Sequence, residues 1–308
     1  PRCDSAPSCT TGRSRPESGR IAMNQDEARP IEVWGSTISY FTGKLEGYLR
    51  WKRIPYRLLP MTSRMFGRVV PRETGAAQMP AVRLPDGRWM TDTTPMIDWF
   101  EEQHPDPRTI PADPVQAFAS RVLEDMADEW LWRPAMHYRW SHPEDARLLA
   151  SQLTDEILSD VAAPRWAKRI AIRRRQTTRF VLRDGVNQHT REHVEGIYLR
   201  MLDALQSILA RRPFLLGEVP TLADFGFFGP MFRHFSIDPT PAAILRARAP
   251  AVWAWVARTW DAREQVVGDS LVEGVPADWG PLLDEAGRGH LAWLDRKSTR
   301  LNSSHTVI

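Results

Sequence analysis

The sequence predicts a mixed α/β domain followed by an all-helical domain. Up to about residue 107, short runs with strand-like alternation are interleaved with segments of helical spacing, whereas every periodic segment beyond about residue 112 has helical spacing. The length of 308 residues also suits about two domains of ordinary size.

The first half of the α/β domain is expected to be a β-α-β unit. Residues 31–34 alternate and end at Gly35, and residues 56–59 form a second short strand. Between them, apolar positions follow helical spacing from Lys44 until Ile54–Pro55, where proline disfavours continuation. The two strands are therefore expected to be parallel.

The second half is expected to be a β-β-α unit that completes a mixed four-stranded sheet. Residues 62–77 are predicted to be irregular, and strands at 80–84 and 88–91 flank the turn residues of 85–87. A helix from about Pro95 to Gln103 closes the domain.

The remainder of the chain is expected to be helical. Apolar spacing predicts one long helix through residues 118–131 and others at 194–209 and 252–260. Thr221 and Asp224 have the form of a capping box that opens a further helix. The expected divisions are a flank at 1–30, the α/β domain at 31–107, a helical domain at 108–275 with an arginine-rich insertion around 141–190, an extension at 276–295 and a foreign-looking tail at 296–308.

The flanks carry the positive charge of the chain. Residues 1–22 have a net charge of +2 and residues 296–308 one of +3, so the total of +3 leaves residues 23–295 at −2. The basic pI is therefore no sign of a nucleic-acid partner. No apolar run approaches the ~18–20 residues of a membrane span, and no signal peptide is recognised. A soluble cytoplasmic protein without a membrane partner is expected.

Cysteine usage narrows the chemistry. Cys3 and Cys9 both lie in the N-terminal flank, so the body contains no thiol nucleophile, disulfide or Cys-rich zinc site. Any sulfur chemistry must use a thiol that a ligand brings.

Residues 78–97 place an unpaired strand edge next to a helix start. Pro80 lacks the N–H that would pair at the edge, and a cis Met79–Pro80 bond would leave the Met79 backbone free to pair with a peptide ligand. Free N–H groups near Thr93 attract a carboxylate, and Asp92 could hold a neighbouring ammonium. The stretch therefore suits a small peptide with one free amine and two carboxylates.

Four segments in this order resemble cytosolic glutathione transferases, over roughly residues 31–262. The loop at 35–44 resembles the family's first strand-to-helix loop, and Met79–Pro80 its cis-proline pair. Asp92–Thr93 resembles the acidic-hydroxyl pair of its third helix. Residues 216–217 with 221–224 resemble the capping motif of its helical domain.

The resemblance implies a thioredoxin-like first domain, a homodimer, a detoxifying role and glutathione as co-substrate. It places Ser39 where the family has a catalytic Ser or Cys, so this hydroxyl would donate to the ligand sulfur and stabilise a thiolate. Ser36, Thr37 and Tyr40 remain open as alternative donors. Met79, Pro80, Asp92 and Thr93 would position glutathione.

The implied function is attack of the glutathione thiolate on an electrophilic carbon of an apolar compound. The alternative is a non-catalytic glutathione- or ligand-binding relative, which Tyr40 and Thr74–Gly75 favour because many family members have other residues at these positions. Trp132, Tyr138 and Tyr40 are the candidates for the lining of the apolar pocket. Neither the electrophile nor the reaction among conjugation, isomerisation, ether cleavage and dehalogenation is fixed by the sequence.

Three further patterns are interpreted as structural. Residues 165–183 carry eight basic side chains and no acid, which favours a solvated helix face. Binding of nucleic acid or of a membrane surface, and binding of an acidic co-substrate, are the weaker alternatives. His189 and His193 have helical spacing but no third ligand, so no metal is expected. Glu124 and Asp128 are expected to be solvated acids on a surface helix.

Overall fold

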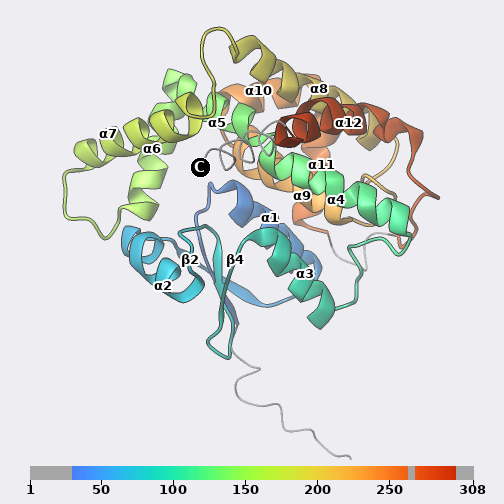
Figure 1. Cartoon of the computed structure of the whole chain (residues 1–308), viewed down its shortest axis with the longest axis horizontal. Helices are drawn as coiled ribbons and strands as arrows, with labels where there is room; N and C mark the ends of the chain where they lie inside the picture. The colour runs from blue at the N-terminus through green and yellow to red at the C-terminus, as the bar shows by residue number, and fades with distance from the viewer. Residues whose placement is uncertain (1–29, 263–267, 296–308) are drawn as a thin grey trace, which may run out of the picture.

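The computed structural model describes residues 30–262 and 268–295. Its first domain contains one four-stranded sheet in the order β2-β1-β3-β4 (Figure 1). Strand β1 pairs parallel with β2 and antiparallel with β3, and β3 pairs antiparallel with β4. The elements of this domain are β1 (Ile31–Gly35), α1 (Tyr40–Trp51), β2 (Tyr56–Pro60), η1 (Met65–Val69), α2 (Val70–Thr74), β3 (Ala81–Arg83), β4 (Trp89–Thr91) and α3 (Thr93–Gln103).

The second domain is helical. Its elements are α4 (Pro114–Glu129), α5 (Trp132–Ser141), α6 (Pro143–Ile157), α7 (Arg165–Gln176), η2 (Thr177–Leu182), α8 (Arg191–Leu209), α9 (Leu222–Pro230), η3 (Met231–Phe235), α10 (Pro239–Arg248), α11 (Pro250–Trp260), η4 (Ala277–Trp279), α12 (Gly280–Glu285) and η5 (Ala286–Leu291). The expected mixed sheet followed by an all-helical domain is confirmed. No described helix is long and apolar enough to cross a membrane. The expected flanks at 1–30 and 296–308 lie almost entirely outside the described residues.

Helix boundaries differ from the sequence prediction at four places. Helix α1 begins at Tyr40, four residues before Lys44, because Ser39 caps it. Helix α3 begins at Thr93 rather than Pro95, and its cap is Asp92. The long helix predicted to reach Leu131 ends at Glu129, and α5 continues from Trp132. The segment predicted to be irregular contains η1 and α2.

The two domains meet through α1, which packs against α9 and lies near α4. The fit is close: a Cβ added to Gly229 on α9 would lie 3.0 Å from the carbonyl oxygen of Tyr40 on α1. A Cβ at Gly47 on α1 would lie 2.6 Å from the ring of Phe228 on α9. The capping box predicted at the start of α9 is present, with Thr221 and Asp224 bonded to each other.

A buried ion cluster crosses the same interface. The ammonium of Lys44, which is fully buried, donates to Oε1 of Glu124 and to Oδ2 of Asp128 at 2.5 Å. Glu124 also accepts a hydrogen bond from Thr94 Oγ1 at 2.6 Å. Burial alone would lower the pKa of Lys44, but the charges of Asp128 and Glu124 outweigh burial and raise it. The expectation that Glu124 and Asp128 are solvated is therefore wrong, because each side chain faces the buried ammonium.

The Lys44→Met substitution tests this cluster. It leaves two buried carboxylates without their cation, so we expect the free energy of unfolding to fall by about 3–5 kcal/mol. Urea unfolding measures this change. The control is Arg248→Met, which removes the exposed ion pair with Asp203 and is expected to cost much less. An equal fall in the free energy of unfolding in the two variants would contradict a large contribution of the buried cluster to stability.

Candidate functional site

The four residues predicted to hold the peptide ligand line one cavity. Met79, Pro80, Asp92 and Thr93 are among the residues around a volume of about 440 Å³. The other lining residues are Phe41, Gln78, Thr94, Pro95, Asp125, Asp128 and Glu129. We call this the polar cavity; it lies between the first domain and α4.

Local structure gives this cavity its two recognition elements. The Met79–Pro80 peptide bond is cis, as predicted, and comes directly before β3. At the start of α3, the Asp92 side chain accepts a hydrogen bond from the Thr94 N–H at 3.3 Å. Asp92 has φ of +72°, a conformation that Asp tolerates better than most residues. A strand edge and a helix N-terminus therefore face the same space.

The charged side chains that line the polar cavity are acidic. Four acids, Asp92, Asp125, Asp128 and Glu129, are among its described lining residues, which include no Lys, Arg or His. Asp128 is shared with Lys44, and Asp125 Oδ2 contacts His290 Nε2 at 2.5 Å. The negative charges of the other two acids, Asp92 and Glu129, favour the binding of a cationic ligand group such as an ammonium.

A second cavity of about 490 Å³ adjoins the first. Its walls are mainly aromatic and aliphatic, and no Asp or Glu is among its described lining residues. We call this the apolar cavity. The residues that line it are Ser36, Ile38, Ser39, Tyr40, Phe41, Ser63, Phe66, Ala77, Gln78, Met79, Trp132, Met136, Arg139, Trp140, Leu153, Ile157, Leu158, Ile172, Arg175, Gln176, Phe180 and His234.

Phe41, Gln78 and Met79 line both cavities. Ser39 lines the apolar cavity but not the polar one. A group that extends from the polar cavity past these three shared residues would therefore enter the space beside Ser39.

The hydroxyl groups near Ser39 are not equivalent. Tyr40 donates its hydroxyl proton to the Ala127 carbonyl, and Thr37 donates its proton to Glu156. The Ser39 hydroxyl accepts a weak bond from the Thr42 N–H at 3.4 Å, which leaves its own proton free to donate to a ligand. Ser36 accepts from the Ile38 N–H at 3.4 Å and is likewise left with a proton to donate. The four open donors are thus reduced to Ser39 and Ser36.

A buried arginine fixes the loop that carries Ser39. The Arg139 guanidinium, from α5, donates to the Ile38 carbonyl at 2.8 Å and to the Arg233 carbonyl at 2.6 Å. Asp238 holds the same guanidinium through two bonds of 2.8 and 2.9 Å. Burial raises the pKa of Asp238 to about 6, against the opposing charge of Arg139. Sequence reasoning missed Arg139, because its partners are 94 to 101 residues away along the chain.

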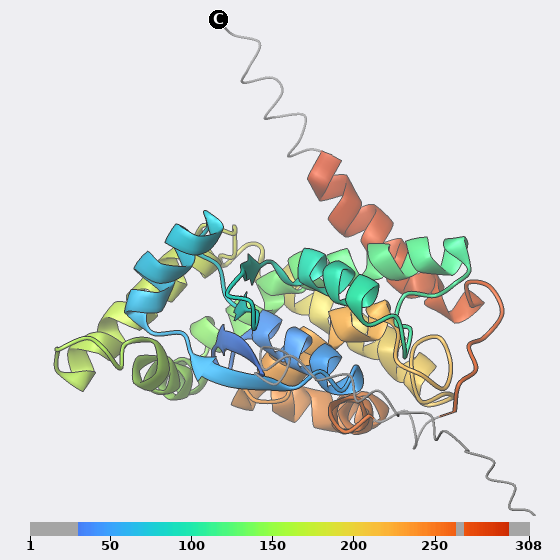
Figure 2. The same ribbon diagram turned by 90° about the horizontal axis from the view of Figure 1, so that it is seen from below.

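The 141–190 segment forms one side of the apolar cavity. Helices α6 and α7 project from one end of the helical domain, beside the end of the first domain that contains η1 and α2 (Figures 1 and 2). The Asp160 carboxylate accepts a hydrogen bond from the backbone N–H of Arg64 at 2.8 Å, and the Glu156 carboxylate accepts one from the backbone N–H of Thr37 at 2.9 Å. These two acids connect the segment to the first domain, whereas Asp155 pairs with an arginine of the segment itself, Arg165.

The predicted pocket residues have different positions. Trp132 and Tyr40 line the apolar cavity and contact each other edge-on at 5.8 Å between ring centroids. Tyr138 is not among the residues that line either cavity. It packs on Tyr198 and His142 in the interior of the helical domain, so its expected place in the pocket lining is corrected. Tyr138 lies only one residue before Arg139 and two before Trp140, which both line the apolar cavity, so it points to another face of α5.

One group of side chains in the described residues has the geometry for a shared metal ion. Ligand atoms of His137, His142 and Glu195 lie within 4.8 Å of one another, and this group does not include His189 or His193. His137 Nε2 hydrogen-bonds to Glu195 at 2.9 Å, which satisfies both groups without an ion. Neither cavity includes these residues.

Comparison with known proteins identifies the class. A model of the glutathione S-transferase N-terminal domain matches residues 34–108, and one of the C-terminal domain matches residues 188–258. With the two-domain fold, these matches show that the chain is a member of the glutathione S-transferase-like superfamily.

Solved structures share the fold at low sequence identity. Beta-etherase LigF from Sphingobium sp. strain SYK-6 is 18% identical with a TM-score of 0.54, and the match covers 77% of this chain and 97% of that chain. A GST-like protein from Pseudomonas syringae is 20% identical with a TM-score of 0.52, covering 75% of this chain and 67% of that chain. No curated protein gives a significant sequence match.

A buried histidine in the apolar cavity makes stability depend on pH. Burial and the charge of Arg139 keep the pKa of His234 well below its usual value, while its bond to the Ala135 backbone opposes this shift. Below about pH 6.5 the unfolded chain takes up a proton that the folded His234 does not, so stability falls as the pH falls.

The His234→Gln variant tests this dependence. Between pH 6.5 and 5, we expect the free energy of unfolding of the wild type to fall by up to about 1.4 kcal/mol more per pH unit than that of the variant. Urea unfolding at several pH values measures the difference, and His189→Gln at an exposed position serves as the control. Parallel pH profiles for wild type and His234→Gln would contradict the neutral state of the buried ring.

Proposed function

We propose that this protein is a glutathione transferase that binds glutathione in the polar cavity and an apolar electrophile in the apolar cavity. The observation that carries this proposal is the shared boundary of the two cavities at Phe41, Gln78 and Met79. A ligand thiol at that boundary would point toward the space beside Ser39.

The polar cavity would provide partners for a peptide group and for the free amino-acid end of glutathione. The backbone of Met79 would pair with a peptide group of the ligand, and the N-terminus of α3 at Thr93 would take the carboxylate next to the free amine. Asp92, with Glu129 on the opposite wall, would take the ammonium. The one-sided acidity of the cavity fits this amino end.

The chemistry follows from the position of the thiol. The N-terminus of α1 and the Ser39 hydroxyl would favour the thiolate, with the thiol proton released to solvent. The sulfur would attack an electrophilic carbon, forming a carbon–sulfur bond while the bond to the leaving group breaks. The leaving group would depart with the bonding electron pair. Ether cleavage, the reaction in the name of beta-etherase LigF, is one form of this displacement.

A second candidate is a glutathione- or ligand-binding protein without catalysis. It is favoured by the position of Ser39, which lines only the apolar cavity and already caps α1. Retention on immobilised glutathione without turnover of electrophiles would support it. A homodimer, a cytoplasmic location and a role in detoxification remain proposals from family membership.

The first prediction concerns the hydroxyl that activates the thiol. We expect Ser39→Ala to lower kcat/KM for benzyl chloride about 10- to 100-fold, because a hydrogen bond to a charged group contributes about 1.5–3 kcal/mol. In the same variant, the pKa of the bound thiol, followed by thiolate absorbance, should rise. Ser39→Thr should restore much of the rate, and Ser36→Ala is the control. An unchanged rate and thiol pKa in Ser39→Ala would remove Ser39 from this role.

The second prediction concerns the ammonium of glutathione. Asp92→Asn removes the charge while an asparagine still caps α3 and tolerates the positive φ. We expect glutathione to bind about tenfold more weakly, a change of about 1.4 kcal/mol, by calorimetry. N-acetylglutathione, which lacks the charged amine, should bind both proteins equally weakly. Undiminished glutathione binding by Asp92→Asn would contradict the assignment.

A further inference from the structure

The two cavities differ in charge as well as polarity. Four acids line the polar cavity, and two of them, Asp92 and Glu129, have no ion pair among the described residues, whereas the apolar cavity has arginines and no described acid on its lining. Away from the N-terminus of α3, a negatively charged ligand group is therefore better accommodated in the apolar cavity than beside the acids of the polar cavity.

Only one of the two arginines in the apolar cavity has its charge compensated. Arg139 is buried and bound by both oxygens of Asp238. Arg175 is exposed at the mouth of the cavity, and in the described part of the chain no carboxylate pairs with it. Burial of part of its side chain and the charge of Arg179 lower its pKa, which is the effect expected of a cation without a counterion.

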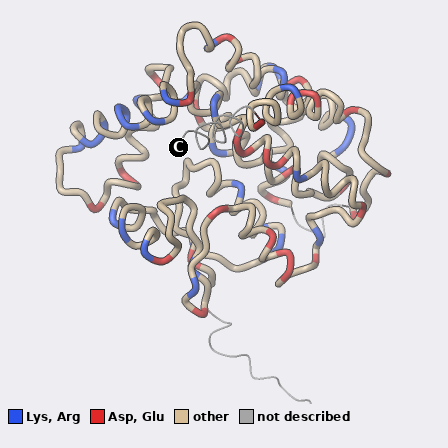
Figure 3. Tube along the Cα trace, in the orientation of Figure 1, with Lys and Arg blue, Asp and Glu red and all other residues tan. Residues whose placement is uncertain are grey.

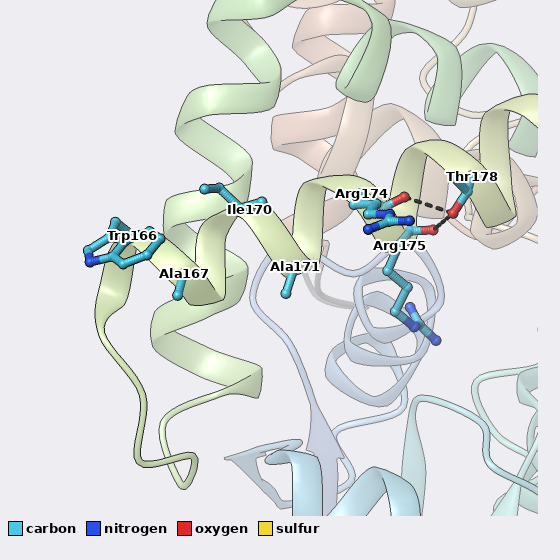
Figure 4. Close-up of a pocket in the computed structure, with 7 residues that line it drawn as sticks. All are labelled: Trp166, Ala167, Ile170, Ala171, Arg174, Arg175 and Thr178. Carbon is cyan, nitrogen blue, oxygen red and sulfur yellow. Dashed lines mark hydrogen bonds between the residues drawn. The ribbon is translucent and has the colours of Figure 1, made fainter.

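Aromatic rings hold Arg175 in place. Its guanidinium carbon lies 5.5 Å from the ring centroid of Phe180 and 6.0 Å from that of Phe66, one ring from each domain. In Figure 4, Arg175 extends from α7 toward the ribbons of the first domain, whereas Trp166 lies at the far end of the helix. Figure 3 shows the wider concentration of Lys and Arg along α7. Arg175 differs from the basic side chains around it, Arg173, Arg174 and Arg179, because it lines the apolar cavity.

The rest of the cavity wall is suited to a flat ring. Trp132 stacks on Phe41 at 5.9 Å between centroids and contacts Phe180 edge-on at 5.5 Å. Stacked and edge-on partners of this kind select planar aromatic groups over bulky aliphatic ones.

From these observations we propose that the apolar cavity binds an aromatic electrophile that carries an anionic group, such as a carboxylate, and that Arg175 pairs with this group. This inference rests on the proposed function for the electrophilic character of the ligand, but the anion site itself can be measured without glutathione. The acids of the polar cavity and Arg175 would together orient the ligand, with the anionic end at the mouth and the reactive carbon toward Ser39.

Calorimetry with two unreactive probes tests the proposal. 2-Naphthoate and 2-naphthamide share one ring system and differ in charge. We expect wild type to bind the naphthoate about fivefold more tightly, the upper range for an ion pair at an exposed position. Arg175→Gln should abolish this preference without changing naphthamide binding, and Arg175→Lys should retain part of it. Arg174→Gln, the adjacent residue that does not line the apolar cavity, is the matched control and should keep the full preference.

Three results would overturn the proposal: equal affinity for the two probes, a preference that survives in Arg175→Gln, or no binding of either probe. Thermal unfolding of each variant verifies that it is folded. A glutathione reaction with 4-(chloromethyl)benzoate and 4-(chloromethyl)benzamide then separates the two claims. Preferred binding of naphthoate without any conjugation would reject the proposed enzyme while retaining the anion site. Conjugation without a preference for the benzoate would reject the anion site alone.

Discussion

The ion cluster of Lys44, Glu124 and Asp128 is the interaction on which the arrangement of the two domains depends. It connects the first helix of the sheet domain to the first helix of the helical domain, where water is excluded and an uncompensated charge would be costly. The same carboxylate of Glu124 binds Thr94, in the first turn of α3. The polar cavity lies along this line of contacts, so the domain interface and the candidate binding site are stabilised by the same side chains.

The apolar cavity depends on a different set of contacts. Its inner wall is fixed by Arg139, which connects α5, η3 and the loop before Ser39. Its outer wall comes from α6, α7 and η2, which contact the first domain through Glu156 and Asp160. The loop that carries Ser39 is therefore held from two sides by residues of the helical domain.

The sequence predicted what local chemistry determines. The succession of strands and helices in the first domain, the capping box at Thr221 and the meeting of Met79–Pro80 with Asp92–Thr93 were predicted from neighbouring residues with known backbone preferences. The positions of Glu124 and Asp128 did not follow, because their burial depends on one lysine about 80 residues earlier. The position of Arg175 at the apolar cavity did not follow either, because the count of charges along the sequence grouped it with the solvated basic residues around it. Periodicity identifies which residues share a helix face, but it does not identify what that face meets.

The outer wall of the apolar cavity belongs to a separate packing unit. The hydrophobic cluster beneath α6, α7 and η2, which includes Leu149, Leu153, Ile172 and Val181, is distinct from the main core of the two domains. Ile38, beside Ser39, belongs to this smaller cluster, and Trp132 packs against both clusters, so these two side chains couple the two regions. Mutations in the 141–190 segment can thus reshape the apolar cavity while the main core keeps its packing. In evolutionary terms, the fold separates the part that can diversify from the part that must be retained, and new ligand preferences can arise at little cost to folding.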